Sequence, residues 1–270
     1  MEFRTVVDIA KPSFQIEPCE EMLFVGSCFA DSIGRRFQEE KFRATVNPYG
    51  TMYNPASVLH TISRCGLAPR IVFITLGTNH VYRLKETGEI VDNCQKRPAA
   101  LFREEVLTVE ECAGYLTQAI DILRQRNPEV CIVLTVSPIR YRKYGYHESQ
   151  LSKATLLLAV DKVTSHLSPL TSHLTYFPAY EIVLDELRDY RFYSEDMLHP
   201  SAQAVEYIWQ QLVEHYFSPR AKQFLQEWAP LKAALGHRPF NPDSEEYRVF
   251  MDKTMLKVAE LQKKYPTFAP

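Results

Sequence analysis

Four short apolar runs constrain the fold of this chain more than any other feature. Each run is rich in β-branched and aromatic residues, and each is nearly continuous instead of alternating between apolar and polar residues. The runs are MLFVG (22–26), IVFITLG (71–77), VCIVLTVS (130–137) and LTYFPAY (174–180). Continuous runs of this kind are typical of strands that are buried on both faces, as in a parallel sheet covered by helices.

Segments of helical length lie beside these runs. They cover residues 28–41, 108–126, 152–167 and 201–217. Strands that alternate with helices of this length form βαβ units, with helices on both faces of the sheet. The pattern therefore predicts an α/β sandwich whose mainly parallel sheet has a flavodoxin-like or Rossmann-like strand order.

The end of the chain has a different pattern. Prolines punctuate residues 218–242, at Pro219, Pro230, Pro239 and Pro242. Residues 244–265 have the pattern of a charged amphipathic helix. We expect a domain over residues 1–217 and a helical extension over residues 218–270, which either packs back on the domain or contacts a partner.

The overall composition disfavours several classes of protein. The 270 residues carry a net charge of −2, which differs from the basic surface of a nucleic-acid-binding protein. No run reaches the roughly 18 apolar residues of a membrane span, and the first residues lack the apolar core of a signal peptide. None of the six cysteines forms a Cys-x-x-Cys pair. We expect a cytoplasmic protein with reduced thiols and without a metal, a cofactor, a nucleic-acid partner or a membrane partner; its oligomeric state stays open.

Ser27 follows the first run, at the sheet edge where parallel α/β proteins bind ligands. It has two interpretations, the N-cap of the following helix or a nucleophile. A nucleophilic serine needs a histidine base, which in turn needs a carboxylate that fixes its tautomer. Asp196 and His199 lie three residues apart and form either such a pair or a surface turn. Cys28 is a rival nucleophile, because a thiol is easier to activate than a hydroxyl.

Further polar residues follow the same strand ends. Gly50 and Asn79 are candidate donors for an oxyanion hole, although a turn glycine and a loop asparagine are the simpler interpretations. Possible substrate contacts come from loops that carry His80, Cys94, Lys96 and Arg140. Such charges are ordinarily solvated, and a zinc site formed by His80, Cys94 and His147 would lack a short ligand pair.

Several motifs together resemble a known family. Gly26-Ser27, Gly50, Gly77-x-Asn79 and Asp196-x-x-His199 occur in the order of the four blocks of the SGNH (GDSL-like) hydrolases. GSCFA (26–30), NPYGTMYNP (47–55), NCQKRP (93–98), SPIR (137–140), SKATLLLAV (152–160) and DYRFYSEDMLHPS (189–201) are similar to the signatures of the bacterial GSCFA family within that superfamily. The resemblance covers roughly residues 20–217.

The resemblance implies a three-layer α/β/α fold of the SGNH hydrolase type with a Ser-His-Asp site. By position, Ser27 would be the nucleophile, His199 the base and Asp196 its orienting carboxylate. The backbone N–H groups of Ser27 and Gly50, with the Asn79 amide, would form the oxyanion hole. The chain departs from the superfamily pattern because Ser27 follows glycine directly and because His80 replaces the aspartate that usually follows the asparagine.

The expected function is therefore a serine esterase that removes an O-acyl group from a small-molecule or glycan ester. An O-acetyl group on a carbohydrate is the preferred substrate, by analogy with the wider superfamily. Two alternatives stay open. An O-acyltransferase would use the same triad with an alcohol in place of water, and a non-catalytic binding domain would keep only the scaffold.

Overall fold

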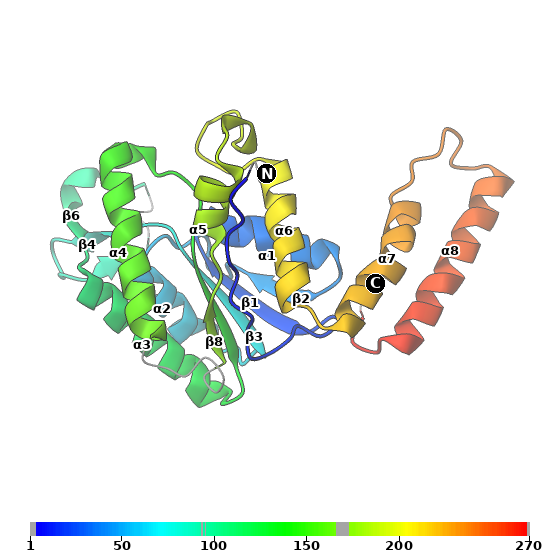
Figure 1. Cartoon of the computed structure of the whole chain (residues 1–270), viewed down its shortest axis with the longest axis horizontal. Coiled ribbons are helices and arrows are strands. Elements are labelled where there is room, and N and C mark those ends of the chain that lie inside the picture. The colour runs from blue at the N-terminus through cyan, green and yellow to red at the C-terminus, as the bar shows by residue number, and fades with distance from the viewer. Residues whose placement is uncertain (1–3, 93, 95, 166–172, 269–270) are drawn as a thin grey trace.

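A computed structural model describes residues 4–92, 94, 96–165 and 173–268 of the protein. In this part of the chain, five parallel strands form the central sheet in the order β2-β1-β3-β7-β8 (Figure 1). The strands are β1 (Glu21–Gly26), β2 (Arg43–Val46), β3 (Ile71–Leu76), β7 (Cys131–Val136) and β8 (Leu174–Tyr176). This is the flavodoxin-like order, so the predicted fold class is confirmed.

Helices cover both faces of the sheet because the strand side chains alternate between two apolar clusters. Phe24, Phe73 and Val133 pair across β1, β3 and β7 and face one cluster, and their neighbours Val25, Ile74 and Leu134 face the other. The first face is covered by α1 (Cys28–Glu39) and α6 (Ala202–Tyr216). The opposite face is covered by α2 (Pro55–Cys65), α3 (Val109–Arg126) and α4 (Tyr146–Thr164) (Figure 1).

Several elements differ from the sequence-based expectation. The fourth strand ends at Tyr176, before Pro178, and the chain continues as the short helix α5 (Ala179–Glu181) and the π-helical turn η3 (Ile182–Leu187). Helix α4 begins at Tyr146 and not near residue 152, directly after Gly145, whose φ is 85°. A second sheet of the described chain was not predicted and contains β4 (His80–Leu84), β5 (Ile90–Val91) and β6 (Phe102–Val106). The remaining single turns are η1 (Ala99–Leu101), η2 (Arg142–Tyr144) and η4 (Tyr190–Phe192).

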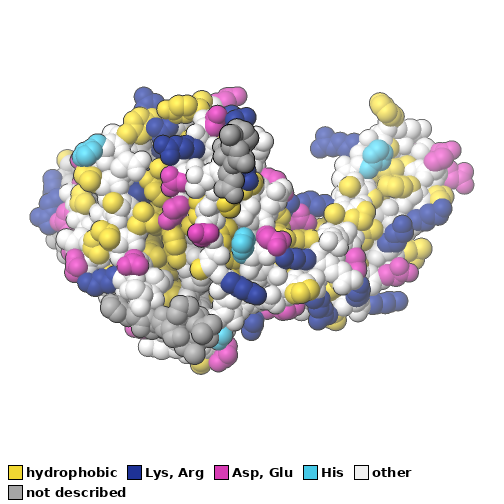
Figure 2. Space-filling view, in the orientation of Figure 1, with side chains coloured by type: hydrophobic (Ala, Val, Ile, Leu, Met, Phe, Trp, Pro, Cys, Tyr) yellow, Lys and Arg dark blue, Asp and Glu magenta, His cyan; other side chains and the backbone are white. Residues whose placement is uncertain are grey.

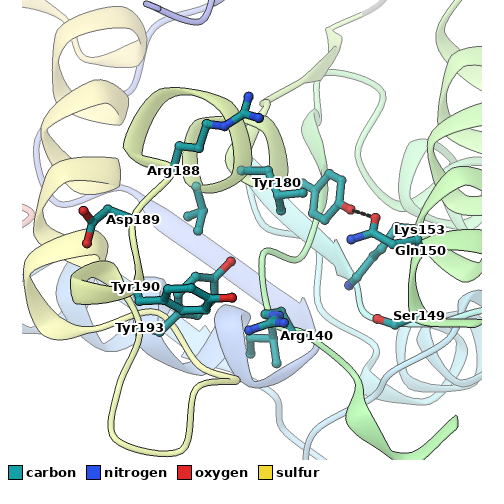
Figure 3. Close-up of a pocket in the computed structure, with 12 residues that line it drawn as sticks. Arg140, Ser149, Gln150, Lys153, Tyr180, Arg188, Asp189, Tyr190 and Tyr193 are labelled. Atoms are coloured by element: carbon teal, nitrogen blue, oxygen red, sulfur yellow. Dashed lines mark hydrogen bonds between the residues drawn. The ribbon is translucent and has the colours of Figure 1, made fainter. Parts of the chain in front are cut away.

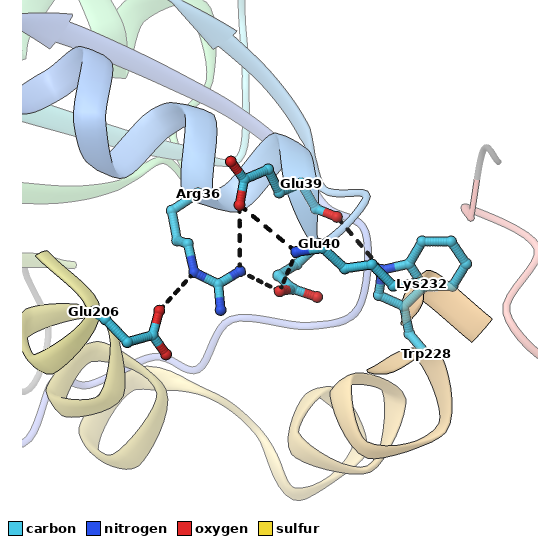
Figure 4. A network of polar contacts seen from close by, with 6 residues as sticks. All are labelled: Arg36, Glu39, Glu40, Glu206, Trp228 and Lys232. Carbon is cyan, nitrogen blue, oxygen red and sulfur yellow. Dashed lines mark hydrogen bonds and ion pairs between the residues drawn. The ribbon is translucent and has the colours of Figure 1, made fainter. Parts of the chain in front are cut away.

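The C-terminal extension is a helical hairpin of α7 (Pro219–Leu235) and α8 (Glu245–Lys264). Proline at the first position of α7 is harmless because that N–H has no helical partner, and the helix also contains Pro230. The indole nitrogen of Trp228 donates to Glu39 O (3.4 Å), and Lys232 pairs with Glu40 (3.0 Å), which also contacts Arg36 (Figure 4). These contacts join α7 to α1, whereas the far end of the hairpin projects away from the sandwich (Figure 1).

The surface carries both signs of charge. On the face drawn in Figure 2, Lys and Arg side chains are interspersed with Asp and Glu side chains. None of the helices within the described residues has the length and hydropathy needed to cross a membrane.

Candidate active site

The turn between β1 and α1 depends on a glycine. Gly26 has φ of 141°, and a Cβ atom there would lie 2.0 Å from Thr75 O on the neighbouring strand β3. Its N–H donates to Asn47 Oδ1 (2.8 Å), which fixes the loop after β2 against the end of β1. Only glycine fits this close approach, and the turn places Ser27 at the carboxyl edge of the sheet.

Ser27 is the N-cap of α1, as one interpretation of the sequence predicts. Its Oγ accepts a hydrogen bond from Phe29 N (3.3 Å), and the residue is 1% exposed. A hydroxyl has one proton to donate and a second lone pair, so the cap leaves the Ser27 proton available to a base. A Cβ atom at Gly77 would lie 3.3 Å from Ser27 Cβ, so the β3–β4 turn packs directly against the serine.

Asp196 and His199 form a closed pair on the loop before α6. His199 Nδ1 lies 2.5 Å from Asp196 Oδ2, while Asp196 Oδ1 accepts from the backbone N–H groups of His199 (3.0 Å) and Leu198 (2.9 Å). These donors, with the imidazole, lower the pKa of Asp196 to about 2. Asp196 is thus an ionised acceptor that orients the imidazole, and Nε2 faces away from it. Both side chains are 43% exposed.

Arg140, a predicted substrate contact, holds this loop. Its backbone N–H donates to Leu198 O (3.0 Å), and its Nη1 donates to Met197 O (3.1 Å). Because Arg140 follows β7, these bonds bring the His199 loop to the same edge of the sheet as Ser27. Among the described residues, no hydrogen bond joins Ser27 to His199.

The three predicted oxyanion donors each contact a protein carbonyl. Ser27 N–H donates to Thr75 O (3.0 Å), and Gly50 N–H donates to Asn47 O (2.8 Å). One N–H of the Asn79 amide donates to Leu107 O (2.7 Å), and Asn79 is 1% exposed. In this structure, therefore, the two backbone donors are occupied and the Asn79 amide keeps one N–H. This differs from the predicted oxyanion hole.

Two residues of α4 that the sequence analysis did not assign fix the turn behind Ser27. Ser152 Oγ bonds to Thr78 Oγ1 (3.0 Å) and accepts from Asn79 N (3.0 Å). Lys153 Nζ donates to Gly77 O (2.7 Å), although Lys153 is 2% exposed. The sequence feature that could have pointed to Lys153 is its position as the one charged residue of the otherwise apolar and small-residue stretch SKATLLLAV (152–160).

Aromatic side chains lie beside the candidate nucleophiles. Cys28 Sγ is 3.5 Å from Tyr53 Oη, and the Tyr53 ring lies 6.2 Å from the Tyr141 ring. Tyr141 neighbours Tyr144, whose ring stacks on His80 at 3.8 Å. This row of rings can pack against the face of a sugar.

The other predicted substrate contacts lie farther along the same loops. His80 is buried beneath the Tyr144 ring, and burial lowers its pKa. Cys94 is half-buried and Lys96 exposed on the loop after β5. Among the described residues, Cys94 and Lys96 have no contact with Ser27 or His199. Their roles as substrate contacts stay predictions. Asn93 and Gln95 of the NCQKRP motif lie outside the described residues.

Comparison with protein families matches most of the chain. A family model described as the GSCFA family matches residues 21–69 and 66–212. A second model, described as the C-terminal domain of GSCFA domain proteins, matches residues 228–269. A search of curated proteins finds no match.

Comparison with solved structures finds similar folds at low sequence identity. A GDSL-like lipase candidate from Parabacteroides merdae has a TM-score of 0.50 and 13% identity, with 76% of this chain and 98% of that chain covered. A GDSL-like lipase from Bacteroides thetaiotaomicron has a TM-score of 0.48 and 13% identity, covering 81% and 92%. A carbohydrate esterase of family 3 from Talaromyces cellulolyticus has a TM-score of 0.43 and 11% identity, covering 77% and 99%. At 13% identity, the similarity to the Parabacteroides merdae structure shows the fold alone.

Proposed function

This chain belongs to the GSCFA family, and from that membership we propose that it is a serine hydrolase of ester bonds of the SGNH (GDSL-like) type. The observation that carries the proposal is the Asp196–His199 pair, held by Arg140 at the sheet edge that also carries Ser27. An ionised carboxylate that accepts from Nδ1 fixes the tautomer in which Nε2 can take a proton.

In the proposed reaction, Ser27 Oγ attacks the ester carbonyl and His199 Nε2 accepts the serine proton. The tetrahedral intermediate collapses to an acyl-enzyme when His199 returns this proton to the leaving alcohol. Water then attacks the acyl-enzyme with His199 as the base, and the acid product leaves with Ser27 restored. Asp196 stays ionised throughout and stabilises the imidazolium.

The oxyanion needs donors that are not occupied by protein carbonyls. Cys28 N–H stands at the first position of α1, beside Ser27, and has no hydrogen-bond partner among the described residues. We place one oxyanion donor there, where the helix dipole also favours negative charge. The second N–H of the Asn79 amide is the other candidate, and its use would keep the Leu107 contact intact.

The proposed substrate is an O-acyl ester of a carbohydrate, with a short acyl group such as acetyl. The row of tyrosine rings beside Cys28 supports this class, because aromatic rings pack on pyranose faces. The second candidate function is a non-catalytic binding domain. It is favoured by two observations: Ser27 is 1% exposed, and its own N–H donates to Thr75 O.

Labelling with a fluorophosphonate, followed by mass mapping of the adduct, tests the proposal. We expect the adduct on Ser27 and its loss in His199→Ala. Cys28→Ser is the matched control and should retain the label, because it changes the neighbouring nucleophile only. An adduct on Cys28 would replace the serine mechanism with thiol chemistry. Unlabelled but folded protein would favour the binding domain.

A further inference from the structure

A cavity of about 290 Å³ lies beside the candidate site, between α4 and the segment that contains η3 and η4. Figure 3 shows side chains from both elements converging on it, with Lys153 and Gln150 on one side and Tyr190 and Tyr193 on the other. One wall is the π-helical turn η3, a distortion that often occurs at functional sites. The volume is suited to one sugar ring or a molecule of similar size.

Two cations line this cavity without an acidic partner. Lys153 is 2% exposed, and its described hydrogen bond goes to the neutral carbonyl of Gly77. The Arg140 guanidinium donates to the carbonyl of Met197 and lies over the rings of Tyr146 (4.3 Å) and Tyr193 (5.3 Å). Neither cation forms an ion pair with any carboxylate of the described residues. A buried ammonium without a counter-ion is costly unless something else supplies the charge.

The other charges at the cavity are already paired. Asp189, its acidic lining residue, accepts from Arg191 N (2.8 Å) and pairs with the Arg191 guanidinium (3.3 Å). Arg188 is exposed and lies 3.8 Å from Asp185. The unbalanced charge of the lining is therefore positive and is concentrated on Lys153 and Arg140.

The neutral lining residues supply rings and further donors. Tyr180 Oη donates to Gln150 Oε1, which leaves the Gln150 amide nitrogen as a donor at the cavity. Lys153 has three N–H donors, and its hydrogen bond to Gly77 uses one of them. The rings of Tyr190 and Tyr193 lie 6.4 Å apart and form an aromatic wall.

The cavity adjoins both halves of the proposed catalytic pair. Gly77 O accepts from Lys153, while a Cβ atom added to the same glycine would lie 3.3 Å from Ser27 Cβ. On the other side, Arg140 binds the His199 loop, and Tyr193 pairs with Pro200, the residue after His199. The lining of the cavity is thus connected to Ser27 through Gly77 and to His199 through its neighbour Pro200.

We propose that this cavity binds the carboxylate of an acidic sugar, held by Lys153 and Arg140, and that the esters cleaved at Ser27 are esters of carboxylate-bearing carbohydrates. The assignment of the substrate rests on the proposed esterase function, whereas the binding of the acidic sugar does not. The unpaired charges of Lys153 and Arg140 favour an anionic group in the cavity. The tyrosine wall suits a sugar ring that carries this group.

The protonation of Lys153 agrees with this role. Burial lowers the pKa of Lys153 to about 7, and a bound carboxylate beside the amine would raise it again. Lys153 would therefore be protonated in the complex at neutral pH. Arg140 faces the cavity from the β7 side, and Tyr180 and Asp189 face it from the segment opposite α4.

Titration calorimetry at pH 6 tests the site with D-glucuronate, D-glucose and D-glucose 6-phosphate. Glucuronate and glucose differ only in having a carboxylate or a hydroxymethyl group. We expect wild type to bind glucuronate at least about tenfold more tightly than glucose, as one charged hydrogen bond implies. Equal affinity for the two, or no binding of either, would overturn the proposal. Tighter binding of the 6-phosphate would assign the cavity to a phosphate instead.

Two lysine variants on the same helix sharpen this test. Lys153→Met should weaken glucuronate binding at least about tenfold, whereas Lys162→Met removes an exposed lysine of α4 and should leave affinity within twofold. Wild-type affinity in Lys153→Met would overturn the assignment. If Lys153→Met does not fold, the glucuronate-to-glucose ratio of wild type still decides.

The Ser27→Ala variant separates the two proposals. It should bind glucuronate as wild type does, because Ser27 does not line the cavity. Glucuronate binding by a protein that does not react with fluorophosphonate would refute the esterase and keep the acidic-sugar site. A reactive Ser27 without selectivity for glucuronate would keep the esterase and refute the site.

Discussion

The burial of Lys153 makes a specific prediction about stability and pH. The pKa of this lysine falls from 10.5 to about 7 on folding, and burial is the cause. Between these values the unfolded chain binds one more proton than the folded chain, so the stability of wild type rises with pH there. The cost of burying the charge is greatest below pH 7 and amounts to about 5 kcal/mol, at about 1.4 kcal/mol per pKa unit.

Lys153→Met removes this titration. The variant leaves Gly77 O without its donor, which costs about 1–3 kcal/mol at any pH, but it no longer buries a charge. The interval from pH 7 to pH 9 spans two units, so the stability of the variant relative to wild type should be about 3 kcal/mol more favourable at pH 6 than at pH 9.

Urea unfolding of both proteins at pH 6 and pH 9 measures this double difference, in which other titrating groups cancel. Lys162→Met is the matched control, since Lys162 is exposed and pairs with Glu110 at the surface (3.1 Å). Its effect should stay below about 1 kcal/mol at both pH values. An equal effect of Lys153→Met at the two pH values would refute the reasoning, because it would mean that the folded lysine keeps an ordinary pKa.

Three further predictions concern the turn and the triad. Ser27→Ala and His199→Ala should each lower kcat for an ester by about 10⁴-fold or more, and the double variant should be little worse than either single variant; additive losses would show that the two do not act together. The Asp196 carboxyl should titrate near pH 2 in a ¹³C NMR titration and should therefore orient His199 above about pH 3. A titration midpoint near pH 4 would contradict the hydrogen bonds that Asp196 accepts from His199 and Leu198. Gly26→Ala should cost more than about 4 kcal/mol in thermal unfolding, because its Cβ would lie 2.0 Å from a carbonyl oxygen. Gly50→Ala meets open space and should cost only the strain of its φ of 92°, about 1–3 kcal/mol; equal losses would contradict the close approach at Gly26.

The sheet was predictable because its signal is local. The runs around Phe24, Phe73 and Val133 are buried on both faces, and burial of this kind leaves nearly continuous apolar sequence. The strand β2 was missed because its four residues are half-buried or exposed at the sheet edge. The helical extension over residues 218–270 was predicted without the bounds of α7, because prolines disfavour a helix locally. In the structure, packing of Phe224 and Trp228 into the apolar core stabilises this helix despite Pro230.

The candidate site was predictable only in part, for a related reason. The pairing of Asp196 with His199 is local and follows from a three-residue spacing. The partners of the Ser27 and Gly50 N–H groups depend on strands and loops that meet only in the fold. The burial of Lys153 was not predicted because a lysine is by default solvated, although its place inside the apolar stretch SKATLLLAV was a local signal.

Gly77 connects these observations. Its carbonyl accepts from Lys153, and its N–H donates to Tyr53 O (2.8 Å). A Cβ atom added to it would lie 3.3 Å from Ser27 Cβ. If the proposed site is correct, a carboxylate bound beside Lys153 neutralises the charge of this lysine, which also donates to Gly77 O. A neutral sugar ester would instead leave the ammonium buried without an anion, or neutral with a weaker hydrogen bond to Gly77. The same lysine would thus favour acidic substrates over neutral ones through an added attraction, and no clash with neutral substrates would be needed.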